Sequence, residues 1–234
     1  MAVSGNLAKD GSIDITSIGK KIFMAFTGLC FCGFLSIHLI GNLTIYGGYE
    51  MFNSYVKHLH AFDPLIKVAE IFLLTFAIIH ITTGLWLFWE NYSARPVKYI
   101  VKKNAGGRTI GSSTMPYTGL FLFLFIIVHL LNFHFIDKTN TTMFDIVSKT
   151  LSDPFYIVFY VIAVLMVAIH ISHGFWSAFQ TFGINHPKYN KLIKGLSLLY
   201  SIIIALGFGL LPIYFFMISN SSSCSYVCPM FLNN

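Results

Sequence analysis

Four histidines stand inside long apolar runs of this chain, and they are matched two by two. His80 opens a His-Ile-x-x-Gly-x-Trp motif that recurs 90 positions later at His170. A Thr-Gly-Leu triplet followed after eight residues by His-Leu places His38, and the same pattern recurs 91 positions later at His129. The matched spacings indicate an internal duplication. The two triplets are residues 27–29 and 118–120.

An ionisable side chain at membrane depth is costly, and this cost makes each of the four histidines a candidate functional group. A single histidine in a helix bundle would also serve as an interhelical hydrogen bond or as part of a proton relay. Two matched pairs of histidines fit haem binding better, because a haem iron takes one imidazole on each face of its planar ring. Neutral imidazole binds iron well, and binding removes an isolated polar group from lipid.

Two glycines and two tryptophans accompany the second pair of motifs. Gly84 and Gly174 stand four residues after their histidines, and therefore one turn along the same helix face. Without a side chain there, a wide macrocycle could lie close to the helix backbone. Trp86 and Trp176 fall near the predicted helix ends, where we expect them to anchor the chain at the membrane interface.

His173 competes with His170 because it stands only three residues further along the chain. Its counterpart in the earlier motif is Thr83, so His173 breaks the repeat whereas His170 keeps it. We therefore expect His170 to be the ligand and leave the role of His173 open. The remaining histidines are expected to be solvated or hydrogen-bonded: His58, His60, His134 and His186.

The composition indicates which kind of secondary structure carries these histidines. Of 234 residues, 56% are hydrophobic and only 10% are charged, whereas a soluble domain carries roughly a quarter charged residues. Apolar runs of about 20 residues are long enough to cross a bilayer. The sequence therefore predicts an all-α membrane protein, a five-transmembrane-helix bundle in which the first two helices are duplicated by the next two.

The predicted helices form one domain, residues 20–218, between a polar N-terminal segment at 1–19 and a tail at 219–234. Asp63-Pro64 and Asp153-Pro154 are helix-start signals. Residues 1–19 show no pattern of a removable signal peptide. Polar connections are expected after the first helix and at 136–153, and Pro212 is expected to kink the last helix. The five helices are predicted at 20–44, 63–90, 116–135, 154–182 and 192–218.

Lysine and arginine sort between the two sides of such a bundle. Of the 15, eleven fall before the first helix, in residues 91–116 and around the last turn, and four fall on the other side. The positive-inside rule then predicts a cytoplasmic N-terminus and an external C-terminus. This sorting explains the net charge of +6 without nucleic-acid binding. Residues 91–116 would also suit docking of a cytoplasmic partner.

Helix direction then separates the histidines by depth. His80 and His170 lie toward the cytoplasmic face, and His38 and His129 lie toward the outer face.

The four cysteines have neither Cys-x-x-Cys nor Cys-x-x-Cys-His spacing, so they indicate neither zinc binding nor covalent haem attachment. Cys30 and Cys32 are expected to be packing residues within an apolar run. Cys224 and Cys228 would form a small disulfide if the tail faces an oxidising compartment.

The motifs resemble those of the di-haem cytochrome b membrane subunit of succinate dehydrogenase and fumarate reductase. The likeness covers about residues 15–218, including Asn-x-x-Ala-Arg-Pro at 91–96 and His-x-x-His-Gly-Phe-Trp at 170–176. It implies that His80 and His170 hold a proximal haem b and that His38 and His129 hold a distal haem b.

The same resemblance implies a location in the bacterial cytoplasmic membrane and two partners, a flavoprotein and an iron–sulfur protein. This chain would relay electrons between the iron–sulfur protein and a membrane quinone, expected to be menaquinone. Succinate or fumarate chemistry would then occur on the flavoprotein, so this chain is a subunit of an oxidoreductase.

One position departs from the pattern of some fumarate reductases in this family. They carry a glutamate two residues before the haem histidine of the fourth helix, where this chain has Ala168. A proton path through that glutamate is therefore not expected here. For the quinone, Asn42, Glu50 and His134 are the available outer-side groups, and Glu50 is the preferred proton acceptor. Lys98 and Arg95 are candidate partners of the haem propionates.

Three other interpretations remain open at this stage. The chain could be the haem b anchor of a hydrogenase or formate dehydrogenase. It could be a proton or metal-ion transporter that uses the histidines as its path. It could also be a structural subunit without a cofactor, although the matched repeats argue against this.

Overall fold

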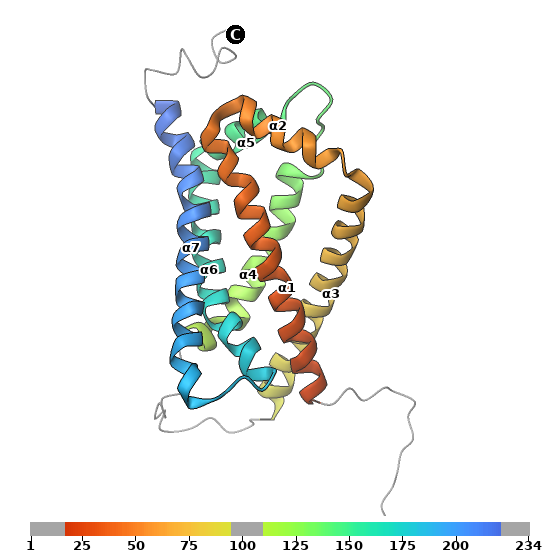
Figure 1. Ribbon diagram of the computed structural model, residues 1–234, viewed down its shortest axis with the longest axis vertical. Coiled ribbons are helices and arrows are strands. Elements are labelled where there is room, and N and C mark those ends of the chain that lie inside the picture. Colours follow the sequence, from red (N-terminus) through yellow and green to blue (C-terminus); the bar gives the residue numbers. More distant parts are fainter. Residues whose placement is uncertain (1–16, 95–109, 221–234) are drawn as a thin grey trace, which may run out of the picture.

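The computed structural model describes residues 17–94 and 110–220, and all of its regular elements are helical. Within these residues, five stretches are long and apolar enough to cross a membrane, and they correspond to α1, α3, α4, α6 and α7. The first stretch continues from α1 through η1 into α2 (Figure 1). In chain order the elements are α1 (Ser17–Leu43), the 3-10 turn η1 (Thr44–Gly47), α2 (Gly48–His60), α3 (Asp63–Ser93), α4 (Ile110–Phe133), α5 (Met143–Ser152), α6 (Pro154–Thr181) and α7 (Pro187–Asn220).

The two predicted Asp-Pro helix starts are confirmed. Pro64 lies in the first turn of α3, and Pro154 is the first residue of α6. The Asp153 carboxylate caps α6 by accepting hydrogen bonds from the backbone N–H groups of Phe155 and Tyr156, at 2.9 and 3.2 Å. A helix N-terminus leaves such donors without partners inside the helix, and this is why a capping carboxylate stabilises it.

The two polar connections predicted at the outer end are largely helical, so that part of the prediction is wrong. The first contains η1 and α2, and the second contains α5. Both helices are amphipathic. Phe52 of α2 and Phe144 of α5 are 5% and 4% exposed, and each packs into a cluster that includes Tyr160 of α6 and Phe215 of α7. Burial of the apolar faces of α2 and α5 stabilises these two helices, although their polar residues suggested loops.

Two predicted starts were placed too late. α4 begins at Ile110, six residues before the predicted start at Pro116, and continues through that proline. α7 begins at Pro187 instead of residue 192, with Pro in the first position, where its missing N–H costs nothing. Pro212 lies inside α7 and is fully buried.

The bundle is organised around α6, which packs against α7, α4 and α1, while α3 packs mainly against α1. Cys32 is 8% exposed and packs with Leu39, Ile171 and Ile204, so its predicted packing role is confirmed. Close approach of α1 and α7 depends on Gly207, because a Cβ there would stand 2.6 Å from a Leu39 methyl carbon.

The outward surface of the bundle is apolar, as lipid contact requires. Ile71, Phe72 and Leu74 of α3 are 65%, 56% and 62% exposed. In water such a surface would be a large aggregation-prone patch, whereas in a bilayer it faces hydrocarbon. The chain is therefore a multi-pass membrane protein.

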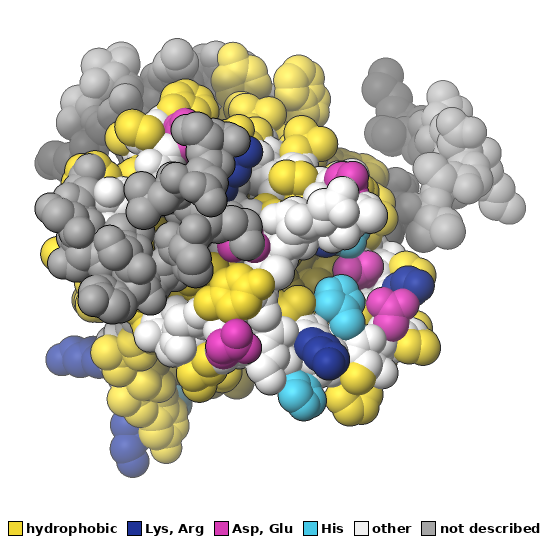
Figure 2. Space-filling view, turned by 90° about the horizontal axis from the view of Figure 1, so that it is seen from above, with side chains coloured by type: hydrophobic (Ala, Val, Ile, Leu, Met, Phe, Trp, Pro, Cys, Tyr) yellow, Lys and Arg dark blue, Asp and Glu magenta, His cyan; other side chains and the backbone are white. Residues whose placement is uncertain are grey.

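The two ends of the bundle differ in charge. The α2–α5 end carries acidic, basic and histidine side chains together (Figure 2), including Glu50, Asp63, Glu70, Lys57 and Lys67. At the opposite end, where α1 and α7 begin, Glu90 is the single acidic residue among those described. We call this the basic end, defined by Lys20, Lys21, Lys188, Lys191 and Lys194. The predicted sorting of lysines is thus confirmed for the described residues.

Candidate functional site

The structure brings the four predicted histidines together in two facing pairs. The ring centroids of His80 on α3 and His170 on α6 are 6.4 Å apart, and those of His38 on α1 and His129 on α4 are 5.9 Å apart. We call His80 and His170 the proximal pair, because they lie nearer the basic end. His38 and His129, nearer α2, are the distal pair.

The spacing within each pair suits a shared metal ion. A metal–imidazole bond is about 2 Å long, so two imidazoles on opposite sides of one ion have ring centres about 6 Å apart. The backbones that carry the rings do not pack closely in either pair: within the described residues, neither α3 with α6 nor α1 with α4 is a closely packed pair. In each pair the two rings therefore meet edge to face from helices whose backbones stand apart.

The donor set favours iron in a macrocycle over a bare metal ion. Among the described residues, no group of three or more His, Cys, Asp or Glu side chains gathers at one point. A tetrahedral zinc site needs such a group, whereas a haem iron needs only the two axial imidazoles because the macrocycle supplies the other ligands.

A buried threonine contacts each proximal histidine. Thr27 Oγ1 lies 3.0 Å from His80 Nδ1, and Thr118 Oγ1 lies 3.1 Å from His170 Nδ1. Both threonines are nearly inaccessible, at 1% and 3% exposed. In the sequence the Thr-Gly-Leu triplets are recognisable only as a repeat, and this recurrence is the one signal that marks the two hydroxyls.

The glycines of those triplets also lie against the proximal rings. A Cβ at Gly28 would stand 3.3 Å from His80 Cε1, and one at Gly119 would stand 3.5 Å from His170 Cε1. The two Thr-Gly dipeptides therefore present a hydroxyl and a bare backbone to the two histidines.

The predicted cradle glycines, Gly84 and Gly174, face methionines of the neighbouring helices. A Cβ at Gly84 would lie 3.7 Å from Met24 Sδ, and one at Gly174 would lie 3.9 Å from Met115 Cε. Both are ordinary contacts made to the flexible end of a side chain. Room for a macrocycle beside these glycines is thus compatible with the packing.

Aromatic rings surround the distal pair. His38 stacks on Phe34 with ring centroids 5.3 Å apart and planes 12° apart, and Phe208 of α7 lies 5.4 Å away. The polar contacts of the distal pair are long. Asn42 Nδ2 is 3.4 Å from His38 Nδ1, and the Tyr160 hydroxyl is 3.5 Å from His129 Nδ1.

His170, and not His173, stands opposite His80. The Cβ of His173 lies against Gly111 of α4, and a Cβ added to Gly111 would stand only 2.7 Å from it. Its ring contacts Trp176 edge-on, with centroids 5.6 Å apart. The other histidines have surface partners, as expected. For example, His134 lies 3.6 Å from Glu70, and His58 lies 2.7 Å from the Ser54 carbonyl oxygen.

Cations cover both motif tryptophans at the basic end. Lys20, which pairs with Glu90, lies 3.9 Å from the centre of the Trp86 ring, and Lys194 lies 4.4 Å from the centre of the Trp176 ring. The indole N–H of Trp176 is buried and has no hydrogen-bond partner among the described residues. This donor beside a cation fits a carboxylate such as a haem propionate. The predicted propionate partners, Arg95 and Lys98, lie outside the described residues, as do Cys224 and Cys228.

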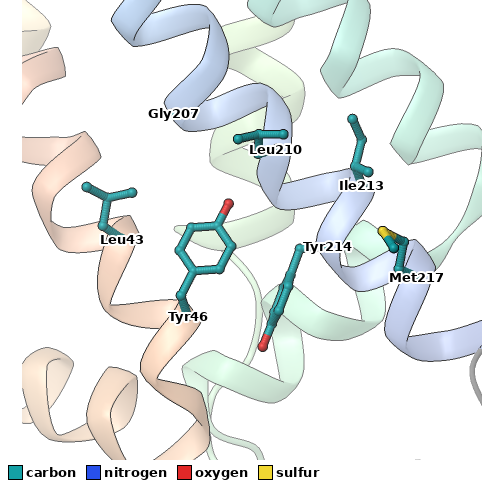
Figure 3. Close-up of a pocket in the computed structure, with 7 residues that line it drawn as sticks. All are labelled: Leu43, Tyr46, Gly207, Leu210, Ile213, Tyr214 and Met217. Carbon is teal, nitrogen blue, oxygen red and sulfur yellow. The ribbon is translucent and has the colours of Figure 1, made fainter.

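The predicted quinone-site residues lie at the α2–α5 end but do not converge. Asn42 contacts His38, Glu50 is exposed in the first turn of α2, and His134 pairs with Glu70. An apolar groove of about 280 Å³ opens nearby between the end of α1 and α7, with the two rings of Tyr46 and Tyr214 in contact (Figure 3). The other lining residues are Leu43, Gly207, Leu210, Ile213 and Met217.

Comparison with known proteins agrees with the resemblance that the motifs predicted. No family model and no solved structure matches the chain. The chain is 27% identical over 192 residues to the succinate dehydrogenase cytochrome b558 subunit of Bacillus subtilis (strain 168). The match covers 79% of this chain and 89% of that protein. The predicted resemblance is therefore confirmed, and the chain is similar over most of its length to a succinate dehydrogenase cytochrome b subunit.

Proposed function

We propose that this chain is the membrane-anchoring cytochrome b subunit of a succinate dehydrogenase or fumarate reductase. It would bind two haem b groups and relay electrons between an iron–sulfur subunit and a membrane quinone. The observation that carries the proposal is the pair of facing histidines at each of two depths, spaced as two axial ligands of one iron. The similarity to a cytochrome b subunit supports the same reading.

The residues of this chain would hold each haem in a defined orientation. His80 and His170 would bind the proximal iron, and His38 and His129 would bind the distal iron, each through Nε2. Gly84 and Gly174 would leave room for the macrocycle, and the apolar helices would keep water away from it. A bis-histidine haem supplies one-electron transfer without ligand exchange at the iron.

The resemblance suggests the partners, and the charge of the two ends supports where they would bind. We place the basic end in the cytoplasm, with the N-terminus, and the C-terminus outside. An iron–sulfur subunit would dock at the basic end, nearest the proximal pair, and carry electrons to or from a flavoprotein that interconverts succinate and fumarate. Membrane lipid surrounds the rest.

The quinone, proposed as menaquinone, would react near the distal pair. Glu50 is our candidate for the group that takes up a proton from the quinol, because it is the acidic side chain of α2 at that end. Moving one elementary charge across the membrane changes its free energy by about 2.3 kcal/mol for each 100 mV of membrane potential. Ala168 cannot carry a compensating proton, so a proton path through α6 at that position is not part of the proposal.

A reduced-minus-oxidised visible spectrum with haem quantification on the purified protein tests the proposal. Two bis-histidine haems b per chain are expected. A protein without haem would exclude this function and favour a histidine-based proton or metal transporter, which predicts colourless protein. One haem would break the two-pair assignment.

The partner subunits separate the remaining haem-binding alternatives. Co-purification of the native complex should recover a flavoprotein together with an iron–sulfur protein. Recovery of a hydrogenase or formate dehydrogenase subunit instead would reassign the chain to another respiratory complex.

A further inference from the structure

We infer that Thr27 and Thr118 are positioning residues for the proximal haem. Each hydroxyl would accept a hydrogen bond from Nδ1–H of one proximal histidine and so leave its Nε2 unprotonated and free to bind iron. This inference rests on the proposed function, and it assigns a role to two residues that do not touch the iron.

The hydrogen-bond geometry favours one direction for the hydroxyl proton, because a carbonyl oxygen of the same helix is within reach of each threonine. The Thr27 hydroxyl donates to the carbonyl oxygen of Phe23 at 2.8 Å, and the Thr118 hydroxyl donates to that of Thr114 at 3.1 Å. A hydroxyl has one hydrogen and two acceptor positions. Once its hydrogen points to the helix carbonyl, the oxygen can only accept from the imidazole, 3.0 or 3.1 Å away.

This arrangement selects one imidazole tautomer. In neutral imidazole, a protonated Nδ1 leaves the lone pair on Nε2, which is the nitrogen available to a metal. Partners of the second nitrogen commonly fix the orientation of a metal-bound histidine and raise its basicity. The adjoining Gly28 and Gly119 contribute by leaving space at Cε1 of the same rings.

Helical threonines do not reach a neighbouring helix by default. The hydroxyls of Thr75 and Thr82, both on α3, donate to carbonyl oxygens of Ile71 and Ile78 in their own helix. The contact from α1 to α3 at Thr27 recurs from α4 to α6 at Thr118, with the same atoms and nearly the same distance. The presence of this contact in both halves of the repeat indicates a maintained arrangement.

The experiment compares valine and serine at both positions in the purified native complex. Thr27→Val and Thr118→Val remove the hydroxyl and keep the shape, whereas Thr27→Ser and Thr118→Ser keep the hydroxyl. Thr82→Val is the matched control, because it removes a hydroxyl from a membrane helix two residues from His80. The measurements are haem content, haem release rate and a potentiometric titration of the two haems.

We expect the valine variants to release the proximal haem about tenfold faster or more. We also expect them to raise its midpoint potential, because a less basic imidazole stabilises ferric iron less. The distal haem, both serine variants and Thr82→Val should match the wild type. Valine variants that match Thr82→Val, or serine variants that behave like valine, would overturn the inference. Wild-type protein without haem would overturn the proposed function as well.

Discussion

The proximal and distal histidine pairs have similar ring spacings, 6.4 and 5.9 Å, but different contacts hold them in place. Each proximal histidine contacts a buried threonine hydroxyl within 3.1 Å. The distal histidines sit among aromatic rings, and their Nδ1 atoms meet an amide and a phenol at 3.4 and 3.5 Å. The proximal pair is therefore fixed by directed hydrogen bonds, and the distal pair mainly by packing.

The matched positions of the two halves account for this difference. At the proximal level the counterpart of Thr27 is again a threonine, Thr118. At the distal level the counterpart of Asn42 is Phe133, whose ring packs 5.1 Å from His129. The counterpart of Tyr160 is Glu70, which pairs with His134. Under the proposed duplication, the two halves would have kept one arrangement at the basic end and diverged at the end assigned to the quinone.

Removal of a ligand should give the largest effect and should separate the pairs. His170→Ala is expected to lose the proximal haem and keep the distal one, and His38→Ala is expected to do the reverse. His173→Ala, three residues from His170, should keep both haems. Haem quantification with electron paramagnetic resonance of the ferric protein measures each outcome. Loss of a haem in the His173 variant alone would show that the ligand was assigned to the wrong histidine.

A change at Glu50 should affect quinone chemistry and leave both haems in place. Proton transfer by a positioned side chain contributes about 100-fold or more to a rate, so Glu50→Gln should lower quinone turnover by about that factor. Reduction of the proximal haem by the iron–sulfur subunit should continue at the wild-type rate. Steady-state assays with a soluble quinone analogue and stopped-flow haem spectra distinguish the two steps. If quinone turnover and reduction of the proximal haem slowed equally, Glu50 would not be the proton acceptor for the quinol.

Alanine at Gly28 and alanine at Gly33, both on α1, should have opposite effects, because only Gly28 lies against the proximal ring. Alanine gains about 1 kcal/mol over glycine in a helix, and overpacking costs about 1–3 kcal/mol. At Gly28 the new Cβ meets His80 Cε1 at 3.3 Å, so the overpacking cost should exceed the gain and weaken proximal haem binding. At Gly33 nothing lies within 4 Å, so alanine should be neutral or stabilising.

Haem retention during thermal unfolding measures this difference. Gly84→Ala is the informative addition, because its Cβ would make only an ordinary contact with Met24. If the macrocycle lies against this glycine as predicted, the variant should fold normally and still bind the proximal haem more weakly. Wild-type haem affinity in Gly84→Ala would place the macrocycle elsewhere.

The sequence predicted the parts of the site that repeat and missed those that depend on contacts between helices. The five long helices followed from apolar runs, and the pairing of His80 with His170 followed from the repeat together with helix direction. α2 and α5 were missed because short amphipathic helices carry the polar residues that also mark loops. The threonine contacts join residues 53 and 52 positions apart, so no local pattern could pair the atoms.

The smallest effect is expected for Tyr160→Phe, which tests whether the distal pair depends less on hydrogen bonding than the proximal pair does. Tyr160→Phe removes one hydroxyl beside His129, just as Thr118→Val removes one beside His170. At 3.5 Å the Tyr160 contact is at the limit of hydrogen-bond length, and the hydroxyl also accepts from Asn132 at 3.3 Å. Its loss should cost at most about 1 kcal/mol of stability.

The midpoint potential of the distal haem in Tyr160→Phe should therefore move less than that of the proximal haem in Thr118→Val. Asn132→Leu serves as the control, because it removes the other partner of the phenol and leaves His129 itself untouched. An equal or larger shift in Tyr160→Phe would mean that the bound haem draws the phenol closer to His129. In that case the two pairs would share one hydrogen-bonding principle, and the contrast between directed hydrogen bonds and packing would not hold.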